Sequence, residues 1–261
     1  FVVSTALTGG TINGAETLCV TGNPGSMNNT VLPTGGNKSF SYQWEESTVS
    51  ATGPFNTIVG ATGQNYDPGG AGALAVTTYF RRRVNSGSCG GDREPNGIPD
   101  NIAYSNVITK TVDQLVVPGV VNNPQTICSG DDPGILGETT SPSGGNGSVY
   151  TFQWQESATG GGVGFAAAPG INNNATYDPP VLTATRFYRR RVTSGVCAAT
   201  FSNEIQITVN PLPTAPNPTG GGAVCAGNPA PDIVWTGLTG TAPFTITYTI
   251  AGVPQAPVVE P

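Results

Sequence analysis

The chain has 261 residues, among them 37 glycines, 23 prolines and no histidine. Glycine and proline are the two poorest helix formers, so a helix-rich fold is excluded, and without histidine there is no histidine-based catalytic triad or histidine metal ligand. Sixteen acidic against ten basic residues give a net charge of −6; this disfavours nucleic acid as a partner, and no apolar run approaches the roughly 18–20 residues of a membrane-spanning helix.

One pattern of motifs occurs twice along the chain. Residues 40–47 (FSYQWEES) return at 150–157, 65–68 (NYDP) at 176–179, 78–87 (TYFRRRVNSG) at 186–195, and 105–109 (SNVIT) at 202–208. Residues 210–213 open a third copy, which runs through Phe244–Tyr248. We therefore expect repeats at 1–113, with an insertion at 90–101, and at 114–210, followed by the N-terminal half of a third at 211–261.

Each repeat has the pattern of a β-sandwich. Large apolar residues alternate with polar ones around Trp44 and Trp154, as in half-buried strands, and clusters of Gly, Pro and Asn separate short strand-forming runs. Each repeat has about 100 residues, with one Trp on an early-middle strand. The sequence therefore predicts an all-β chain of tandem immunoglobulin-like domains, the last one partial.

The combined motifs resemble the Ig-like or PKD-like repeats of very large secreted proteins of the Bacteroidota, including gliding-associated surface adhesins and substrates of the type IX secretion system. This resemblance covers nearly the whole chain. It implies an extracellular or cell-surface location, in agreement with five cysteines in a chain of this composition.

The resemblance also implies one disulfide in each complete repeat, Cys19–Cys89 and Cys128–Cys197. A second pairing stays open, because the turns that carry the two cysteines lie at opposite ends of an immunoglobulin-like sandwich: Cys19 could reach Cys197 and join adjacent repeats. Free thiols are the third alternative. Cys225 is expected to lack a partner because its repeat is incomplete.

The repeated arginines, 81–83 and 189–191, permit two interpretations. Neighbouring strand residues face opposite ways, so the middle arginine points away from its neighbours. The triplets could form an anion-binding stripe, but their place beside the Trp motif favours a structural role, with stems stacked on Trp44 or Trp154 and charges paired with Glu45, Glu46 or Glu156. The predicted structural core contains Trp44, Trp154, Tyr66, Tyr177, Arg82 and Arg190.

The insertion in the first repeat contains a candidate calcium loop. Its oxygen ligands would be Asp92, Glu94, Asn96 and Asp100, with the backbone carbonyl of Ile98, and a glycine stands at the sixth position. The stretch resembles the thrombospondin type 3 calcium loop, although it has Glu94 in place of Asp and alanine at the twelfth position. Structural Ca²⁺ is the only cofactor expected; the alternative is a polar loop.

No catalytic constellation is apparent. Asp67 and Asp178 lie in Tyr-Asp-Pro turns, where Asp is a turn former, and the glycine runs at 160–162 and 220–222 lack a phosphate-loop context. The sequence favours a non-catalytic structural or adhesive segment, a stalk whose partners are neighbouring repeats or copies of itself. The alternatives are a subunit of a fibre assembled by strand complementation and a module that binds surface glycans.

Overall fold

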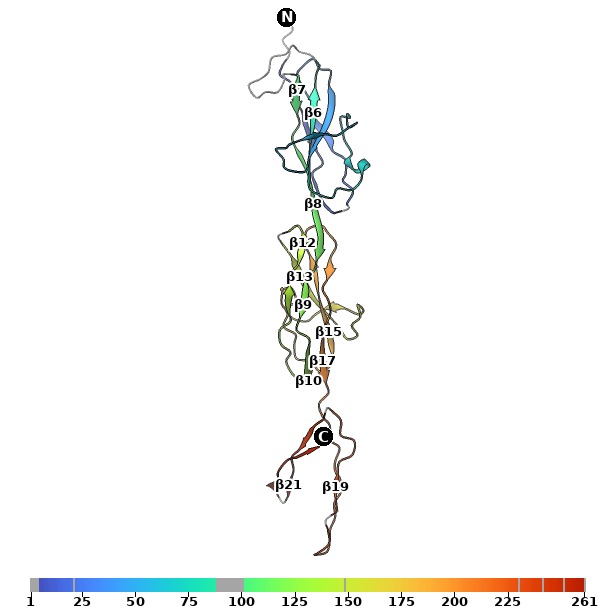
Figure 1. The fold of residues 1–261 in the computed structure, drawn as a ribbon, viewed down its shortest axis with the longest axis vertical. Helices are drawn as coiled ribbons and strands as arrows, with labels where there is room; N and C mark the ends of the chain where they lie inside the picture. Colours follow the sequence, from blue (N-terminus) through green and yellow to red (C-terminus); the bar gives the residue numbers. More distant parts are fainter. Residues whose placement is uncertain are drawn as a thin grey trace. The chain divides into compact units, whose positions relative to one another are not determined.

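The computed structural model describes residues 5–20, 22–87, 101–147, 149–229, 231–240, 242–250 and 252–260. Their regular structure consists of β-strands and one short 3-10 helix, so the chain is all-β, as its composition predicts (Figure 1). No helix within these ranges has the length and apolar character needed to span a membrane.

The first repeat forms a sandwich of two sheets. Its elements are β1 (Thr11–Asn13), β2 (Glu16–Cys19), β3 (Asn28–Val31), β4 (Ser41–Ser47), β5 (Asn56–Thr57), η1 (Pro68–Ala71), β6 (Thr78–Asn85), β7 (Ile102–Tyr104) and β8 (Ile108–Val117). The larger sheet has the order β8-β6-β4-β5, with β2 parallel to β8 and β7 beside β6. β1 and β3 pair separately, and Ile12 of β1 shares a core with Trp44, Phe80 and Ile108 of the larger sheet.

The second repeat has the same design. Its strands are β9 (Val120–Asn122), β10 (Gln125–Cys128), β11 (Gly137–Thr140), β12 (Ser143–Gly145), β13 (Thr151–Ser157), β14 (Ala166–Ala167), β15 (Arg186–Thr193), β16 (Thr200–Phe201) and β17 (Ile205–Asn210). β10, β17, β15, β13 and β14 form one sheet in that order. Trp154, Tyr177, Tyr188 and Ile207 are fully buried in its core. The two complete repeats are thus immunoglobulin-like β-sandwiches.

Strand alternation explains the buried positions. β6 and β15 bury every second residue, and this places Arg82 and Arg190 inside while the arginines on either side remain half-exposed. Trp44 and Trp154 are fully buried, and each indole N–H donates to a backbone carbonyl, that of Gly63 at 2.9 Å or of Asn174 at 3.0 Å. The predicted core residues therefore lie in the interior, except that Tyr66 is half-buried at the edge of its core.

The shared Ser-Asn motif joins the two sheets of each sandwich. The Asn106 amide accepts from the Ile12 N–H at 2.8 Å and donates to the Ile12 carbonyl at 2.9 Å. Asn203 makes the same pair of bonds with Val121, both at 2.9 Å. The motif is therefore a strand clamp within each repeat.

The Tyr-Asp-Pro turn has the expected structural role. The Asp67 carboxylate caps η1 by accepting from the Gly69 N–H at 3.0 Å. This agrees with Asp as a turn former.

The remaining residues form short antiparallel pairs. They are β18 (Thr219–Gly220) with β19 (Ile233–Val234), β20 (Phe244–Ile246) with β23 (Val258–Glu260), and β21 (Thr249–Ile250) with β22 (Val253–Pro254). β20 covers the first three residues of the segment Phe244–Tyr248, through which the third copy is expected to run.

The chain divides into two compact units that do not follow the repeat boundaries. The first contains residues 1–118, 142–151 and 192–200, and the second contains 119–141, 152–191 and 201–261. Two segments of the second repeat therefore belong to the same compact unit as the first repeat. These segments form the candidate site.

Candidate functional site

β8 is the element on which the site is built. Its first part lies in the sheet of the first repeat, where Phe80 pairs with Ile108 and Thr78 with Lys110. Its last four residues continue past that sheet and pair with β12, Gln114 with Gly145 and Val117 with Ser143. One uninterrupted strand therefore serves both repeats, as Figure 1 shows for the labelled strands β6, β8 and β12.

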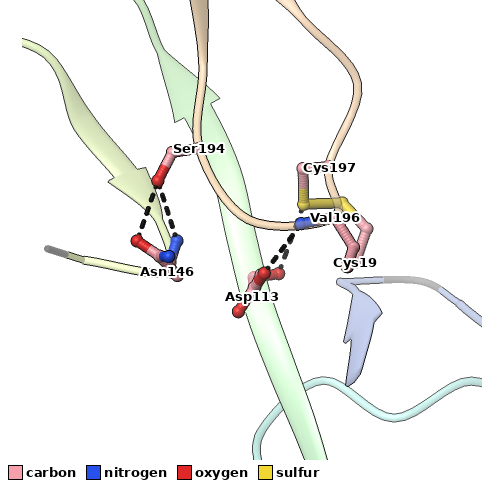
Figure 2. Close-up of a disulfide and its surroundings, with 6 residues drawn as sticks. All are labelled: Cys19, Asp113, Asn146, Ser194, Val196 and Cys197. Atoms are coloured by element: carbon pink, nitrogen blue, oxygen red, sulfur yellow. Dashed lines mark hydrogen bonds between the residues drawn. A yellow bond between two sulfur atoms is a disulfide. The ribbon is translucent and has the colours of Figure 1, made fainter. Parts of the chain in front are cut away.

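A disulfide joins Cys19 to Cys197, and it lies beside this strand (Figure 2). β2 runs parallel to β8 and places Cys19 opposite Asp113. Cys197 belongs to the loop that follows β15. Its Cα atom lies 4.9 Å from that of Cys19, within the normal range for a disulfide.

The disulfide pairs expected from the resemblance, Cys19–Cys89 and Cys128–Cys197, are therefore wrong, because Cys19 and Cys197 are bonded to each other. Cys128 and Cys225 are exposed and bond to no other cysteine among the described residues; Cys89 lies outside those residues. The open alternative, a bond between adjacent repeats, is the one the structure contains.

Strand direction explains the pairing. β2 is parallel to β8, so Cys19 lies at the end of the first repeat where β8 leaves it. β6 is antiparallel to β8, so the segment after β6 begins at the opposite end of the same repeat. In the second repeat, β10 is parallel to β17 and β15 is antiparallel to it, so Cys128 and the end of β15 lie at opposite ends of that sheet. Cys197, the late cysteine that the structure describes, is therefore placed to reach Cys19 rather than Cys128.

Asp113 organises the loop that carries Cys197. Its carboxylate accepts from the Val196 N–H at 3.0 Å (Figure 2). Its carbonyl accepts from the Val20 N–H at 2.8 Å. The Asp113 side chain is buried, so these bonds compensate for part of its lost hydration. Asp113 therefore contacts the residue after Cys19 and the residue before Cys197.

Gly195 allows this loop to lie so close to Asp113. Its φ of +62° is in the left-handed region, and a Cβ atom at this position would lie 1.9 Å from Asp113 Oδ2. Gly144, at φ +76°, is similarly close to β8, because its Cβ would lie 2.0 Å from the Leu115 carbonyl oxygen. Both positions require glycine for conformation and for space.

A polar cluster supports the loop from within the second repeat. The Ser194 hydroxyl donates to Asn146 Oδ1 at 2.9 Å and accepts from the Asn146 N–H at 3.2 Å (Figure 2). Ser194 is buried, and the Tyr150 hydroxyl donates to the Gly144 carbonyl at 3.0 Å. These bonds fix the loop before it reaches Cys19.

The arginine triplets are held by intramolecular contacts. Arg81 lies between the rings of Phe55 and Tyr104, 4.1 Å and 3.9 Å from their centroids, and forms an ion pair with Glu45 at 2.8 Å. Arg83 approaches the same carboxylate at 3.9 Å. This agrees with the structural interpretation, in which the aromatic partners were expected to be the tryptophans.

The buried arginines have backbone partners. Arg82 donates to the carbonyls of Gln64 and Gly9 at 2.7 Å and 3.1 Å and lies over the Tyr42 ring rather than over Trp44. Arg190 donates to the Ala175 carbonyl at 2.7 Å and pairs with Glu138 at 2.6 Å, an acid that the sequence interpretation missed. Arg190 also lies over Phe152 and Trp154.

The glycine run at 160–162 contacts the chain's own carboxylate. The N–H groups of Gly161 and Gly162 donate to Glu204 at 2.9 Å and 2.7 Å. Adjacent backbone N–H groups of this kind bind anions, and here the anion is a side chain of the same repeat. The run is therefore a structural loop, as expected.

The candidate calcium loop, with Asp92, Glu94, Asn96, Ile98 and Asp100, lies outside the described residues. Among the residues that are described, no group of three or more Cys, Asp and Glu side chains is arranged to hold a metal ion. Structural Ca²⁺ in the insertion thus remains a prediction.

Sequence reasoning did not identify Asp113 or Gly195 as junction residues. The available signal was the shared Ser-Gly-x-Cys sequence, which places a glycine two residues before Cys89 and Cys197 alike. Since Cys19 has an equivalent in Cys128, one early and one late cysteine occur in each of the first two repeats.

Comparisons with known proteins identify one matching family model and several solved structures of low sequence identity. Similar solved structures include Sidekick-1 immunoglobulin domains 1–5 (11% identity, TM-score 0.29), a marsupial T cell receptor (12%, 0.43) and the chicken CNTN1 FN1–FN3 domains (12%, 0.31). The matches cover 96%, 80% and 97% of this chain and 50%, 75% and 85% of those chains, so this chain spans half of the Sidekick-1 structure. These likenesses are too distant to carry an argument about function.

No curated protein matches the chain. The family model described as a domain of unknown function, DUF8696, matches residues 8–114 and again residues 117–211. Since these two segments make up most of the sequence, the chain belongs to the DUF8696 family and contains two copies of its domain.

Proposed function

We propose that the chain is a non-catalytic structural segment of a large extracellular protein, in which tandem sandwiches form a stalk on the cell surface. The observation that carries this proposal is the Cys19–Cys197 bond beside β8. The parent protein would be of the kind that the repeat motifs resemble, a secreted surface adhesin.

The covalent topology favours a load-bearing role. A force applied on both sides of the bonded pair passes along the backbone to Cys19, across the disulfide, and on from Cys197. The segment between the two cysteines, which are 178 positions apart in the sequence, is therefore not extended by the force. A segment that supports a distant binding region under tension needs this property, whereas an enzyme or a receptor domain does not.

The disulfide also supports an extracellular location. Structural disulfides persist in oxidising compartments and are rare in the cytosol. Covalent support is useful in this chain, because short strands rich in glycine lose much conformational entropy on folding.

The size of the natural polypeptide tests the proposal. Denaturing, reducing electrophoresis would be combined with peptide mapping by mass spectrometry. We expect a polypeptide far larger than the 26.5 kDa of this sequence, with further copies of the Trp and arginine motifs. A natural chain near 26.5 kDa, with no further repeats, would contradict a stalk and would favour a subunit of an assembled fibre.

A further inference from the structure

Cys128 in the second repeat lies in a local structure that matches the one around Cys19 in the first repeat. β10 is parallel to β17 and places Cys128 opposite Asn210, just as β2 places Cys19 opposite Asp113. The residues that follow the two cysteines also correspond. The Ser129 N–H donates to the Asn210 carbonyl at 2.8 Å, and the Val20 N–H donates to the Asp113 carbonyl at 2.8 Å. Cys128 is thus the positional equivalent of Cys19.

The two positions differ in what covers them. Cys19 is half-buried and bonded, and Asp113 is buried beneath the 195–197 loop. Cys128 is exposed, with a thiol in no disulfide, and Asn210 is half-exposed. The difference is the one expected if the same surface is occupied in one repeat and open in the other.

The residues after β17 begin another copy in the same way. Thr214 and Thr239 exchange backbone hydrogen bonds at 3.2 Å and 3.1 Å and contact each other through their hydroxyls. Thr8 and Thr34 form the equivalent bridge at the start of the first repeat. After Asn210 the chain therefore forms a bridge that corresponds to the one at the start of the first repeat.

We propose that Cys128 is the attachment site for the Ser-Gly-x-Cys loop of another repeat. In the resulting ladder, the early cysteine of each repeat bonds to the late cysteine of the next. This proposal rests on the tandem-segment function proposed above and extends it, because it places a disulfide at every junction between successive repeats rather than at one junction.

The chemistry of the bond defines its occupant. Two thiols lose two protons and two electrons to form the disulfide, and a low-molecular-weight disulfide such as oxidised glutathione accepts the electrons and is reduced to two thiols. The incoming loop needs glycine two residues before its cysteine, because a Cβ at Gly195 would collide with the side chain of residue 113. Asn210 retains the acceptor, since its amide oxygen can accept from the backbone N–H of the incoming loop that corresponds to the Val196 N–H bonded to Asp113.

Peptide mapping of the natural, full-length polypeptide tests the proposal. Free thiols would be blocked with N-ethylmaleimide, and the protein digested with pepsin at acidic pH, where thiolates are scarce and disulfides do not exchange. We expect the Cys128 peptide to be disulfide-linked to a peptide containing Ser-Gly-x-Cys. Non-reducing electrophoresis would then show whether that loop belongs to the same polypeptide or to another molecule.

Two results would overturn the proposal: Cys128 modified by N-ethylmaleimide, or Cys128 bonded to Cys225 or to a peptide without the motif. The size of the polypeptide under reducing conditions distinguishes a failure of this proposal from a failure of the proposed stalk function. A large, repeat-rich polypeptide with a modified Cys128 would eliminate the ladder alone. A polypeptide near 26.5 kDa whose Cys128 is bonded to the loop of another molecule would eliminate the stalk alone.

Discussion

Cys19 and Cys197 are 178 residues apart in the sequence, and their Cα atoms lie 4.9 Å apart across a disulfide. In a chain-entropy model, closing a loop of this length stabilises the folded state by about 5 kcal/mol. The bond joins the early cysteine of one repeat to the late cysteine of the next. Both cysteines lie within the same compact unit, although they come from different repeats.

Reduction of this bond is expected to lengthen the chain under force. In single-molecule pulling from the two termini, the reduced chain should extend further than the oxidised chain by about 600 Å, since each freed residue adds about 3.3–3.6 Å. A variant with both Cys128→Ser and Cys225→Ser should show the same difference, because these thiols take part in no disulfide. Equal extension with and without reductant would contradict the shielding of residues between the two cysteines.

The substitution Gly195→Ala is expected to impair formation of the disulfide. The new Cβ would lie 1.9 Å from Asp113 Oδ2, so either the Asp113 carboxylate or the loop must shift, and this disturbs the bond from the Val196 N–H that positions the loop. Thiol titration after oxidative refolding should find additional free thiols in this variant.

Gly170→Ala is the matched control for that experiment. Gly170 has φ +72° and no atom within 4 Å of the added Cβ, so it carries only the left-handed backbone cost of about 1–2 kcal/mol. We expect its thiol count to equal that of the wild type. If Gly195→Ala also matched the wild type, the close contact with Asp113 would not control the loop.

In the first repeat, Glu16 and Lys110 together make the hydrogen bonds that one glutamine makes in the second repeat. The Glu16 carboxylate accepts from the Gly25 N–H at 2.7 Å, and the buried Lys110 ammonium donates to the Gly25 carbonyl at 2.8 Å. In the second repeat, Gln125 alone makes both bonds to Gly134, at 2.7 Å and 2.8 Å. The position that Lys110 occupies is there taken by Ile207.

We therefore expect Glu16→Gln to destabilise the chain by roughly 1–3 kcal/mol, because it leaves the buried ammonium without its carboxylate. Adding Lys110→Ile should restore most of the loss by recreating the pattern of the second repeat. Denaturant unfolding of the two variants measures this. If the double variant proved less stable than the single one, the equivalence of the two arrangements would be refuted.

The same pair predicts a dependence of stability on pH. The hydrogen bond from Lys110 lowers the pKa of Glu16 below its usual value of 4.5. A lowered pKa in the folded state means that the pair stabilises the protein above about pH 4.5 and loses this effect as the pH falls through the folded value. The wild type should therefore lose more stability than Glu16→Gln/Lys110→Ile between pH 5 and pH 3, measured by thermal unfolding. Parallel curves for the two proteins would argue against the ion pair.

Arg82→Met tests the structural role of the arginine triplets. It leaves the carbonyls of Gln64 and Gly9 without their donor, at roughly 1–3 kcal/mol for the buried Gly9 carbonyl and less for the part-buried Gln64 carbonyl. Arg81→Ala should have a smaller effect, because its ion pair with Glu45 is partly exposed. Unfolding free energies check the order, and a greater loss for Arg81→Ala than for Arg82→Met would contradict it.

The sequence was sufficient to predict the fold and most of the core. Alternation in 78–84 and 186–192 correctly indicated that Arg82 and Arg190 face inward, and Trp44 and Trp154 occupy the interior. The acid beside Arg190 was missed, because Glu138 lies on a strand with no counterpart of that charge in the first repeat.

The disulfide could not be derived from motif spacing alone. Spacing shows that each of the first two repeats has an early and a late cysteine, and the expected topology put them at opposite ends, but neither decided between a bond across the junction and the pairs implied by the resemblance. What decides between them is the parallel pairing of β2 with β8 and the antiparallel pairing of β6 with β8. Strand direction is set by the topology of the whole repeat.

The most direct test of the account is the identity of the residue bonded to Cys19. Peptide mapping of the oxidised, unreduced 261-residue chain, with free thiols blocked first, would identify the linked peptides. The account predicts a peptide with Cys19 joined to a peptide with Cys197, and thiol-blocked Cys128 and Cys225. A Cys19–Cys89 linkage, together with Cys128–Cys197, would contradict the covalent junction and with it the load-bearing array.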